Sequence, residues 1–229
     1  MQPYLFPYAG YFQLVAAADR FVFYDDVNFI KNGWINRNRL VLSGAARYFT
    51  VPLDGASSFR KISETRAQPP EVWRRKLLES IRQSYSRAPF FSEVFELVEN
   101  VLGDAAQMRI GEMAKASVVA VARYLGLSTE FVWTSATYRN EYLSGAERVI
   151  DICRREAARH YYNLPGGRSL YDPAMFASAG IELHIIDVFL PEYSHGKQPV
   201  PQGLSILDVL MWNDVETVSA MVSKSGRVP

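Results

Sequence analysis

Cysteine is almost absent from this 229-residue chain, in which Cys153 stands alone. A single thiol excludes an internal disulfide and a cluster of cysteine metal ligands, and it fits a reducing compartment. Long apolar runs are missing too, since no stretch reaches the roughly eighteen residues that a membrane span needs. The N-terminus also has no basic stretch followed by an apolar run. We therefore expect a cytoplasmic protein with no integral membrane segment.

A surplus of charge of either sign is also missing. The 25 Lys and Arg residues face 24 Asp and Glu residues, which leaves a net charge of +1. No overall field then recruits nucleic acid, and the basic helical face WRRKLLESIRQSYSR at 73–87 is typical of a solvated surface. We predict a small-molecule partner and no nucleic acid, and the sequence leaves the oligomeric state open.

What the chain does contain is an alternation of strand and helix patterns. Strand patterns lie at 20–27, 130–135, 159–164 and 181–189, and helix patterns at 10–18, 144–158, 172–180 and 205–213. Successive β-α-β units favour parallel strands. The segments RLVL and YFTVPL, joined around Ser43-Gly44, predict a hairpin. We predict an α/β fold with a mainly parallel Rossmann-like sheet, flanking helices, a β-hairpin excursion and a helical insert at about 70–127, all in one domain over 1–229.

The loop YDDVNFIKNGWINRN follows the first strand, where ligands collect in parallel sheets. It concentrates Asp25, Asp26, Lys31, Trp34, Asn36, Arg37 and Asn38 within fourteen residues. An acid pair can orient a base, hold a divalent ion or bind an ammonium group, and Lys31 and Arg37 can clamp a carboxylate or phosphate. A solvated strand end with Asx turns and an Arg–Asp pair is the alternative. The added Trp-Ile-Asn-Arg-Asn run favours a binding loop.

Two further segments supply candidate binding residues. The opening MQPYLFPYAGYFQL offers flat aromatic faces at Tyr4, Tyr8 and Tyr11, and its prolines and Gly10 favour an ordered wall over a tail. The turn NLPGGRSLYD contains Gly166 and Gly167, which favour a tight turn with positive φ over a phosphate loop. Arg168 and Tyr171 can face a ligand from this turn.

The three histidines differ in their surroundings. His195, in PEYSHG, is the best candidate for a general base because imidazole exchanges protons near neutral pH. His184 lies in an apolar strand and is interpreted as structural, while His160 begins another strand. No spacing joins the three into a metal site, and we predict no metal. Cys153, beside Val149 and Ile150 on a helix face, is interpreted as an inert buried thiol.

Several uncommon strings in this order resemble the WbqC-like family across nearly the whole chain. They are QPYLFPYAGYFQL, YDDVNFIKNGWINRNRL, FTVPL, RVIDICRREAARHYYN, PGGRSLYDPAMFASAGIEL and LSILDVL. The resemblance implies a bacterial protein of O-antigen or other surface polysaccharide biosynthesis, with transfer of glycine or a related acyl group to a sugar. The matching positions are Gln2, Pro3, Tyr4, Pro7, Gly10, Tyr11, Tyr24, Asp25, Asp26, Lys31, Trp34, Asn36, Arg37, Gly166, Gly167 and Tyr171.

The sequence departs from the family pattern in two places. Relatives carry a short strand before Gln-Pro, whereas Met1 directly precedes Gln2 here. Relatives also tend to have Tyr-x-Gln where this chain has Tyr193-Ser194-His195, so the case for His195 rests on its own chemistry. The order of loop, helix and strand is similar to the nucleotidyltransferase and pantothenate-synthetase type, although Tyr8-Ala9-Gly10-Tyr11 replaces the two histidines of that signature.

The leading functional hypothesis is a transferase that moves an acyl or aminoacyl group, such as glycine, from an amino-acid donor onto a nucleotide-linked sugar or related metabolite. Asp25 or Asp26 would bind an ammonium or accept a proton, Lys31 would hold a carboxylate or phosphate, and His195 would be an auxiliary base. One alternative is an adenylate-forming ligase or nucleotidyltransferase with ATP and Mg²⁺ as cofactors. Another is a non-catalytic sugar-nucleotide binding protein. The sequence leaves the cofactor unknown.

Overall fold

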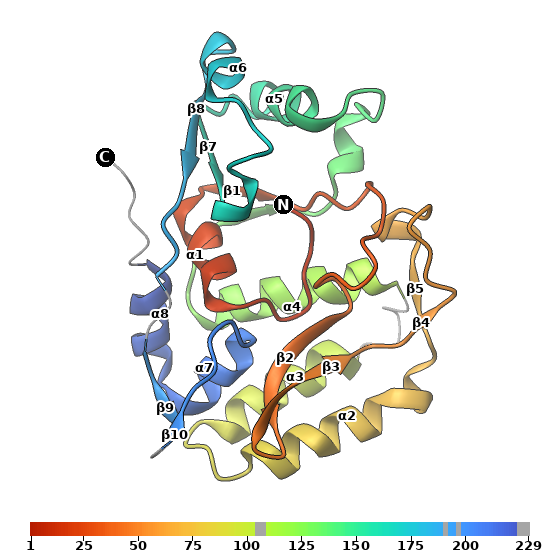
Figure 1. Ribbon diagram of the computed structural model, residues 1–229, viewed down its shortest axis with the longest axis vertical. Helices are drawn as coiled ribbons and strands as arrows, with labels where there is room; N and C mark the ends of the chain where they lie inside the picture. The colour runs from red at the N-terminus through yellow and green to blue at the C-terminus, as the bar shows by residue number, and fades with distance from the viewer. Residues whose placement is uncertain (104–108, 190–191, 196–197, 224–229) are drawn as a thin grey trace.

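The computed structural model describes residues 1–103, 109–189, 192–195 and 198–223. The described residues form a mixed α/β fold with small two-stranded sheets among eight α-helices. Helices α5 and α6 lie at one end of the molecule with strands β7 and β8, while the hairpin β2–β3 lies with helices α2 and α3 toward the other (Figure 1).

Helix α1 (Ala9–Ala17) and strand β1 (Arg20–Val22) begin the chain's regular structure. The helix is buried over almost its whole length because it carries no charged residue. Strand β1 pairs in parallel with β6 (Glu130–Val132), in a register that places Phe21 opposite Phe131. On the other edge of β1, the backbone of Met1 donates to Val22 and accepts from Tyr24, as a neighbouring parallel strand would.

The predicted hairpin is confirmed. Strands β2 (Arg37–Leu42) and β3 (Ala45–Thr50) pair antiparallel around Ser43 and Gly44. Both turn residues have positive φ, 51° and 78°, as a two-residue turn of type I′ requires. Strands β4 (Leu53–Asp54) and β5 (Arg66–Ala67) form a second short antiparallel pair beside the 3₁₀ turn η1 (Ile62–Glu64).

Three helices follow where the sequence predicts them: α2 (Pro70–Tyr85), α3 (Phe91–Gly103) and α4 (Ile110–Tyr124). Helix α2 starts with Pro70 at its first position and buries Trp73, Leu77, Ile81 and Tyr85 at a spacing of four residues. Helix α4 crosses the middle of the molecule (Figure 1) and buries Lys115 and Ser117, two polar residues that contact the functional region.

The C-terminal half builds a second parallel pair. The 3₁₀ turn η2 (Ser135–Tyr138) leads into helix α5 (Gly145–Arg155), strand β7 (His160–Asn163), turn η3 (Pro165–Gly167), helix α6 (Pro173–Ser178) and strand β8 (Glu182–Ile185). A small separate core of Ile150, Cys153, Phe176 and Ile181 holds this unit together. Strands β9 (Ser194–His195) and β10 (Gln198–Pro199) and helices α7 (Ile206–Trp212) and α8 (Val215–Ser223) complete the described chain.

The expectation of a single Rossmann-like sheet is corrected by the structure. The β-α-β units do give parallel pairs, β1 with β6 and β7 with β8, but the described strands form separate two-stranded sheets. The second edge of β1 bonds to the Met1 backbone, and β1 and β7, which both contribute to the wall of a cavity, do not share a ladder. Among the described helices, none combines the length and the apolar character needed to cross a membrane.

Candidate functional site

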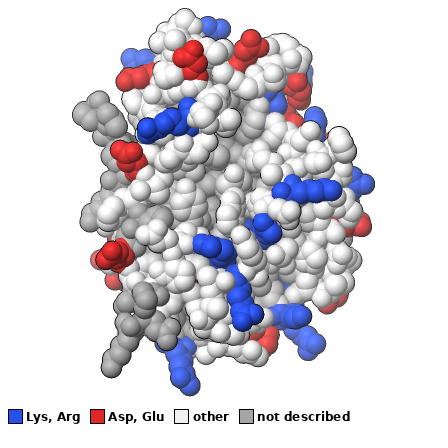
Figure 2. All heavy atoms as spheres, viewed as in Figure 1, with Lys and Arg blue, Asp and Glu red and all other residues white. Residues whose placement is uncertain are grey.

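A cavity of about 1640 Å³ lies between the opening segment, hairpin β2–β3, strand β1, helix α5 and strand β7. Its wall includes the aromatic side chains of Tyr4, Tyr8, Tyr24, Trp34, Tyr48, Tyr161, Tyr162 and Tyr171. In the space-filling view the middle of the face is mostly uncharged, and Lys and Arg side chains gather over the hairpin region below it (Figure 2). Concave, largely apolar sites with a few polar groups are typical of small-molecule binding.

The opening segment forms an ordered part of this wall. Leu5 and Phe6 are fully buried, while Tyr4, before them in the chain, and Tyr8, after them, line the cavity. Burial raises the pKa of both tyrosines, so their hydroxyls remain neutral and able to donate hydrogen bonds. Tyr11 lies behind the wall, where its hydroxyl donates to the Gln2 carbonyl at 2.8 Å.

Side chains from distant elements fix the backbone of this segment. Asn38 on β2 donates from Nδ2 to the carbonyls of Leu5, at 3.1 Å, and Phe6, at 2.9 Å. Ser205 donates to the same Phe6 carbonyl at 2.6 Å, and the Phe6 amide donates to Ser117 Oγ on α4 at 2.9 Å. Phe6 itself has φ of 41°, a left-handed conformation that an aromatic residue adopts only when its surroundings impose it.

The Gly-Gly turn borders the cavity for a different reason from the one expected. Neither Gly166 nor Gly167 has positive φ, which corrects the prediction of a turn that needs it. A Cβ on Gly167 would overlap the side chain of Asn163, whose Oδ1 accepts the Leu164 amide at 2.8 Å. Gly167 therefore permits a close approach between turn and strand, while a Cβ on Gly166 would meet no atom within 4 Å.

Polar groups on the wall include Gln2, Asn38, Asn163 and Arg39. Arg39 Nη2 donates to the Gln202 carbonyl at 2.5 Å, while Arg39 Nε is buried with no hydrogen-bond partner among the described residues. Arg20 also borders the cavity, but Glu130 and Glu156 neutralise it at 2.6 and 2.5 Å. Arg39 and Arg159 are therefore the cations among the described lining residues that no described carboxylate pairs with.

The acid pair lies behind the cavity wall. Counted as whole residues, Asp25 and Asp26 are 1% and 5% exposed, and neither is among the described lining residues. Asp25 Oδ2 lies 2.9 Å from Lys115 Nζ, and its Oδ1 accepts from the Thr134 hydroxyl at 2.7 Å.

Asp26 is held in the same way by a different cation. Its Oδ2 lies 2.5 Å from Arg148 Nη2, and its Oδ1 accepts from the Ser135 hydroxyl. Arg148 also stacks over the ring of Tyr24, with the guanidinium carbon 4.9 Å from the ring centroid. The two acids thus anchor the chain directly after Tyr24, which does face the cavity.

The remaining predicted residues divide by position. Gln2, Tyr4, Tyr8, Trp34, Gly166, Gly167 and Tyr171 line the cavity, whereas Tyr11, Lys31, Asn36, Arg37, Arg168 and His195 are not among its described lining residues. Asn36 donates to the Val51 carbonyl at 3.0 Å, and Arg37 closes its own loop by donating to the Gly33 carbonyl at 3.1 Å. Lys31 and Arg168 are exposed.

His195 belongs to a separate polar cluster beside α7. Its Nε2 lies 2.6 Å from Oδ1 of the fully buried Asp208, and the Tyr193 hydroxyl donates to the same oxygen at 2.6 Å. The ring stacks on Trp212 with centroids 4.9 Å apart. Cys153 is buried, and desolvation raises the pKa of its thiol to about 11, which suppresses the reactive thiolate.

Sequence reasoning missed several residues on the wall: Arg39, Tyr48, His160, Tyr161, Tyr162 and Asn163. It placed Asn38 in the polar first loop but gave it no role. The HYYN strand carried one usable signal, because ligand sites adjoin strand ends and this strand is rich in polar aromatic residues. Arg39 gave none, since its partner Gln202 lies 163 residues away in the sequence.

The described residues form a mixed α/β fold with a cavity whose wall includes several tyrosine side chains and Trp34. The chain belongs to the WbqC-like protein family, whose sequence pattern matches residues 2–220. It is also similar to "Uncharacterized protein Rv1507c" of Mycobacterium tuberculosis (strain ATCC 25618 / H37Rv), with 29% identity over 209 residues that cover 89% of this chain and 88% of that protein. No solved structure matches the chain.

Proposed function

We propose that this protein is a cytoplasmic transferase that moves an acyl or aminoacyl group, such as glycine, onto a sugar or a related small metabolite in bacterial polysaccharide or secondary-metabolite biosynthesis. The observation that supports it best is the size and lining of the cavity. A single small ligand occupies a pocket of about 300–1,000 Å³. At about 1640 Å³, the cavity has room for an acceptor and a donor together, as group transfer requires.

The aromatic wall suits a sugar acceptor. The rings of Tyr8, Trp34 and Tyr162 offer flat faces for the apolar side of a sugar or for a nucleotide base, while neutral tyrosine hydroxyls and Gln2 meet polar groups. Arg39 is our proposed anchor for a phosphate or carboxylate.

The paired acids take a supporting role in this proposal. Because Asp25 and Asp26 already neutralise Lys115 and Arg148 behind the wall, we propose that they position Tyr24 and do not touch substrate. His195 and Lys31 remain candidates for auxiliary proton transfer and for anion binding when a bound substrate reaches them.

Thermal unfolding in the presence of candidate ligands tests the proposal. Nucleotide-linked sugars and glycine are expected to raise the midpoint saturably, because a ligand that binds only the native state stabilises it by about 2.7 kcal/mol at a hundredfold excess over Kd. The Trp34→Ala variant should weaken the sugar's binding about two- to tenfold, because one aromatic contact contributes roughly 0.5–1.5 kcal/mol. Trp34 is 37% exposed, so the fold should persist.

The matched control is Phe59→Ala, which removes a 91% exposed ring that does not line the cavity. Sugar binding in Phe59→Ala should equal that of the wild type. The second candidate function is a non-catalytic sugar-nucleotide binding protein, which is favoured by the fact that both acids already pair with buried cations. An assay for transfer of labelled glycine to the stabilising sugar distinguishes it from an enzyme. No stabilisation by any nucleotide-linked sugar would refute both.

A further inference from the structure

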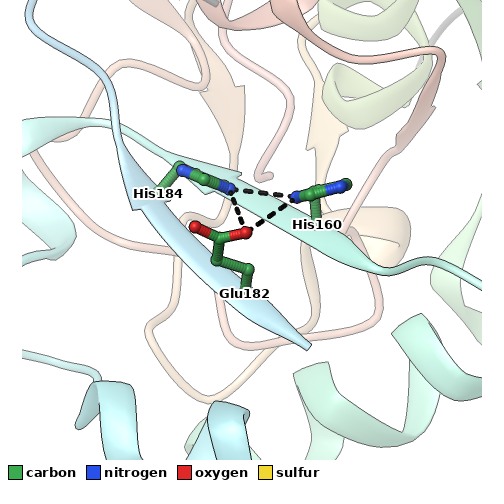
Figure 3. A group of neighbouring side chains, drawn as sticks. All are labelled: His160, Glu182 and His184. Atoms are coloured by element: carbon green, nitrogen blue, oxygen red, sulfur yellow. Dashed lines mark hydrogen bonds and ion pairs between the residues drawn. The ribbon is translucent and has the colours of Figure 1, made fainter. Parts of the chain in front are cut away.

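Three side chains outside the predicted site converge at the start of the β7–β8 pair. His160 is the first residue of β7, and Glu182 and His184 lie two residues apart on β8. The parallel register places His160 opposite Glu182, and side chains two residues apart on a strand share one face. The two imidazole rings and the carboxylate therefore point toward one another (Figure 3).

The distances within this triad match the edges of a metal coordination shell. His160 Nδ1 lies 3.1 Å from His184 Nε2, and Glu182 Oε2 lies 3.5 Å from the first nitrogen and 3.6 Å from the second. Zinc bonds of about 2.0–2.2 Å at tetrahedral angles separate neighbouring ligand atoms by roughly 3.3 Å. A single ion thus has room to contact all three atoms.

Hydrogen bonding alone does not account for the arrangement. The contact between the two rings is a hydrogen bond, but both carboxylate contacts exceed the usual range of about 2.7–3.2 Å. All three atoms nevertheless face one point, where a cation would neutralise the carboxylate and use both imidazole lone pairs.

The strands and a stacked ring give the ligands defined positions. His184 is only 10% exposed, and Tyr162 stacks against it with ring centroids 4.9 Å apart and an 18° angle between the planes. His160 and Glu182 are 51% and 66% exposed, so an ion can enter from solvent. A site with three protein ligands keeps one coordination position for a water or a substrate atom.

We propose that His160, Glu182 and His184 form a binding site for a divalent transition metal ion of the zinc type. Two nitrogens and one oxygen suit zinc and related ions better than calcium or magnesium, which prefer oxygen. His160 and Tyr162 also line the cavity, whereas Glu182 and His184 are not among its described lining residues, so the proposed site lies at the edge of the cavity. There the ion would polarise the carbonyl or phosphate of a substrate, a role that rests on the proposed function, whereas metal binding itself does not.

Calorimetric titration of the chelator-treated full chain with ZnCl₂, with no sugar or acyl donor present, tests the site. We expect saturable binding of one ion per chain. His160→Ala and Glu182→Gln should each weaken it at least about tenfold, since even outer partners of metal ligands contribute about 10–100-fold. The side chains of His160 and Glu182 are more than half exposed, so circular dichroism should show an unchanged fold in these two variants. His184→Ala is a third variant, which removes the most buried ligand.

Matched controls are Glu192→Gln, an exposed acid, and His195→Gln, which removes the histidine outside the triad; both should bind Zn²⁺ like the wild type. Absence of saturable binding in the wild type overturns the proposal, as does wild-type affinity in His160→Ala and Glu182→Gln. If Zn²⁺ binds and no sugar stabilises the protein, the metal site stands and the transferase proposal fails. If sugars bind and Zn²⁺ does not, the metal site alone is refuted.

Discussion

Asp25 and Asp26 are neighbours in sequence, yet their carboxylates meet different cations from different helices. Lys115 comes from α4 and Arg148 from α5, and all four side chains are at most 4% exposed. A buried charge without its partner is costly, so each acid is required once its cation is buried. Lys115 also contacts Glu112 at 2.6 Å, whereas Asp26 is the acid that Arg148 contacts among the described residues.

Asp26→Asn is therefore a more informative substitution than Asp25→Asn. The amide leaves the Arg148 guanidinium buried without a counter-ion, so the free energy of unfolding should fall by about 3–5 kcal/mol. Urea denaturation measures it. Asp187→Asn, at an exposed position, is the control and should change the free energy of unfolding by less than about 0.5 kcal/mol. Wild-type stability combined with lost transfer would instead show that Asp26 takes part in the chemistry.

At the scale of elements, residues 1–8 of the opening segment form neither helix nor strand, and side chains from three other elements hold them in place. Strand β2 supplies Asn38, helix α4 supplies Ser117, and the start of α7 supplies Ser205. Together they satisfy the backbone groups around the left-handed Phe6, and they hold Tyr4 and Tyr8 at the cavity. Rigid elements thus position a loop that carries the binding surface.

Asn38→Ala tests this dependence. It removes the Nδ2 donor from the carbonyls of Leu5 and Phe6 at a site that is 3% exposed, so we expect a loss of about 1–3 kcal/mol in the free energy of unfolding. Hydrogen exchange of the amides in 4–8 should accelerate as well. Asn28→Ala, with an exposed side chain, is the matched control. Unchanged exchange in Asn38→Ala would mean that Ser117 and Ser205 suffice to hold the segment.

Local patterns predicted the elements better than their assembly. The hairpin followed from alternation around Ser43-Gly44, and the helices at 70–124 from their apolar spacing and Pro70. The single parallel sheet was wrong because a strand's own sequence does not say which segment its second edge meets, which for β1 is the backbone of Met1. The same holds for sites: the partners of Asp26 and the convergence of His160 with His184 depend on long-range packing and on strand register.

At the scale of the whole molecule, the cavity lies between two hydrophobic cores of unequal size. The larger includes α1, α4 and the hairpin. The smaller has four buried residues, which are Ile150 and Cys153 on α5, Phe176 on α6 and Ile181 directly before β8. Ion pairs join the two parts, Arg148 with Asp26 and Arg20 with Glu156. Ligands that contact both walls would add to these few connections, so binding and the stability of the smaller part should be coupled.

Native-state hydrogen exchange measures this coupling. Because a small core opens at a lower free energy than a large one, the opening reactions that expose the amides of β7 and β8 should have a lower free energy than those that expose the amides of α4. Phe176→Ala, which removes the fully buried ring of the smaller core, should widen the difference by about 3–5 kcal/mol and leave α4 protection little changed. A sugar that binds the cavity should raise the protection of β7 toward that of α4. Equal free energies of exchange for β7 and α4 in the unliganded wild type would instead show one cooperative unit, in which the cavity is enclosed by a single core.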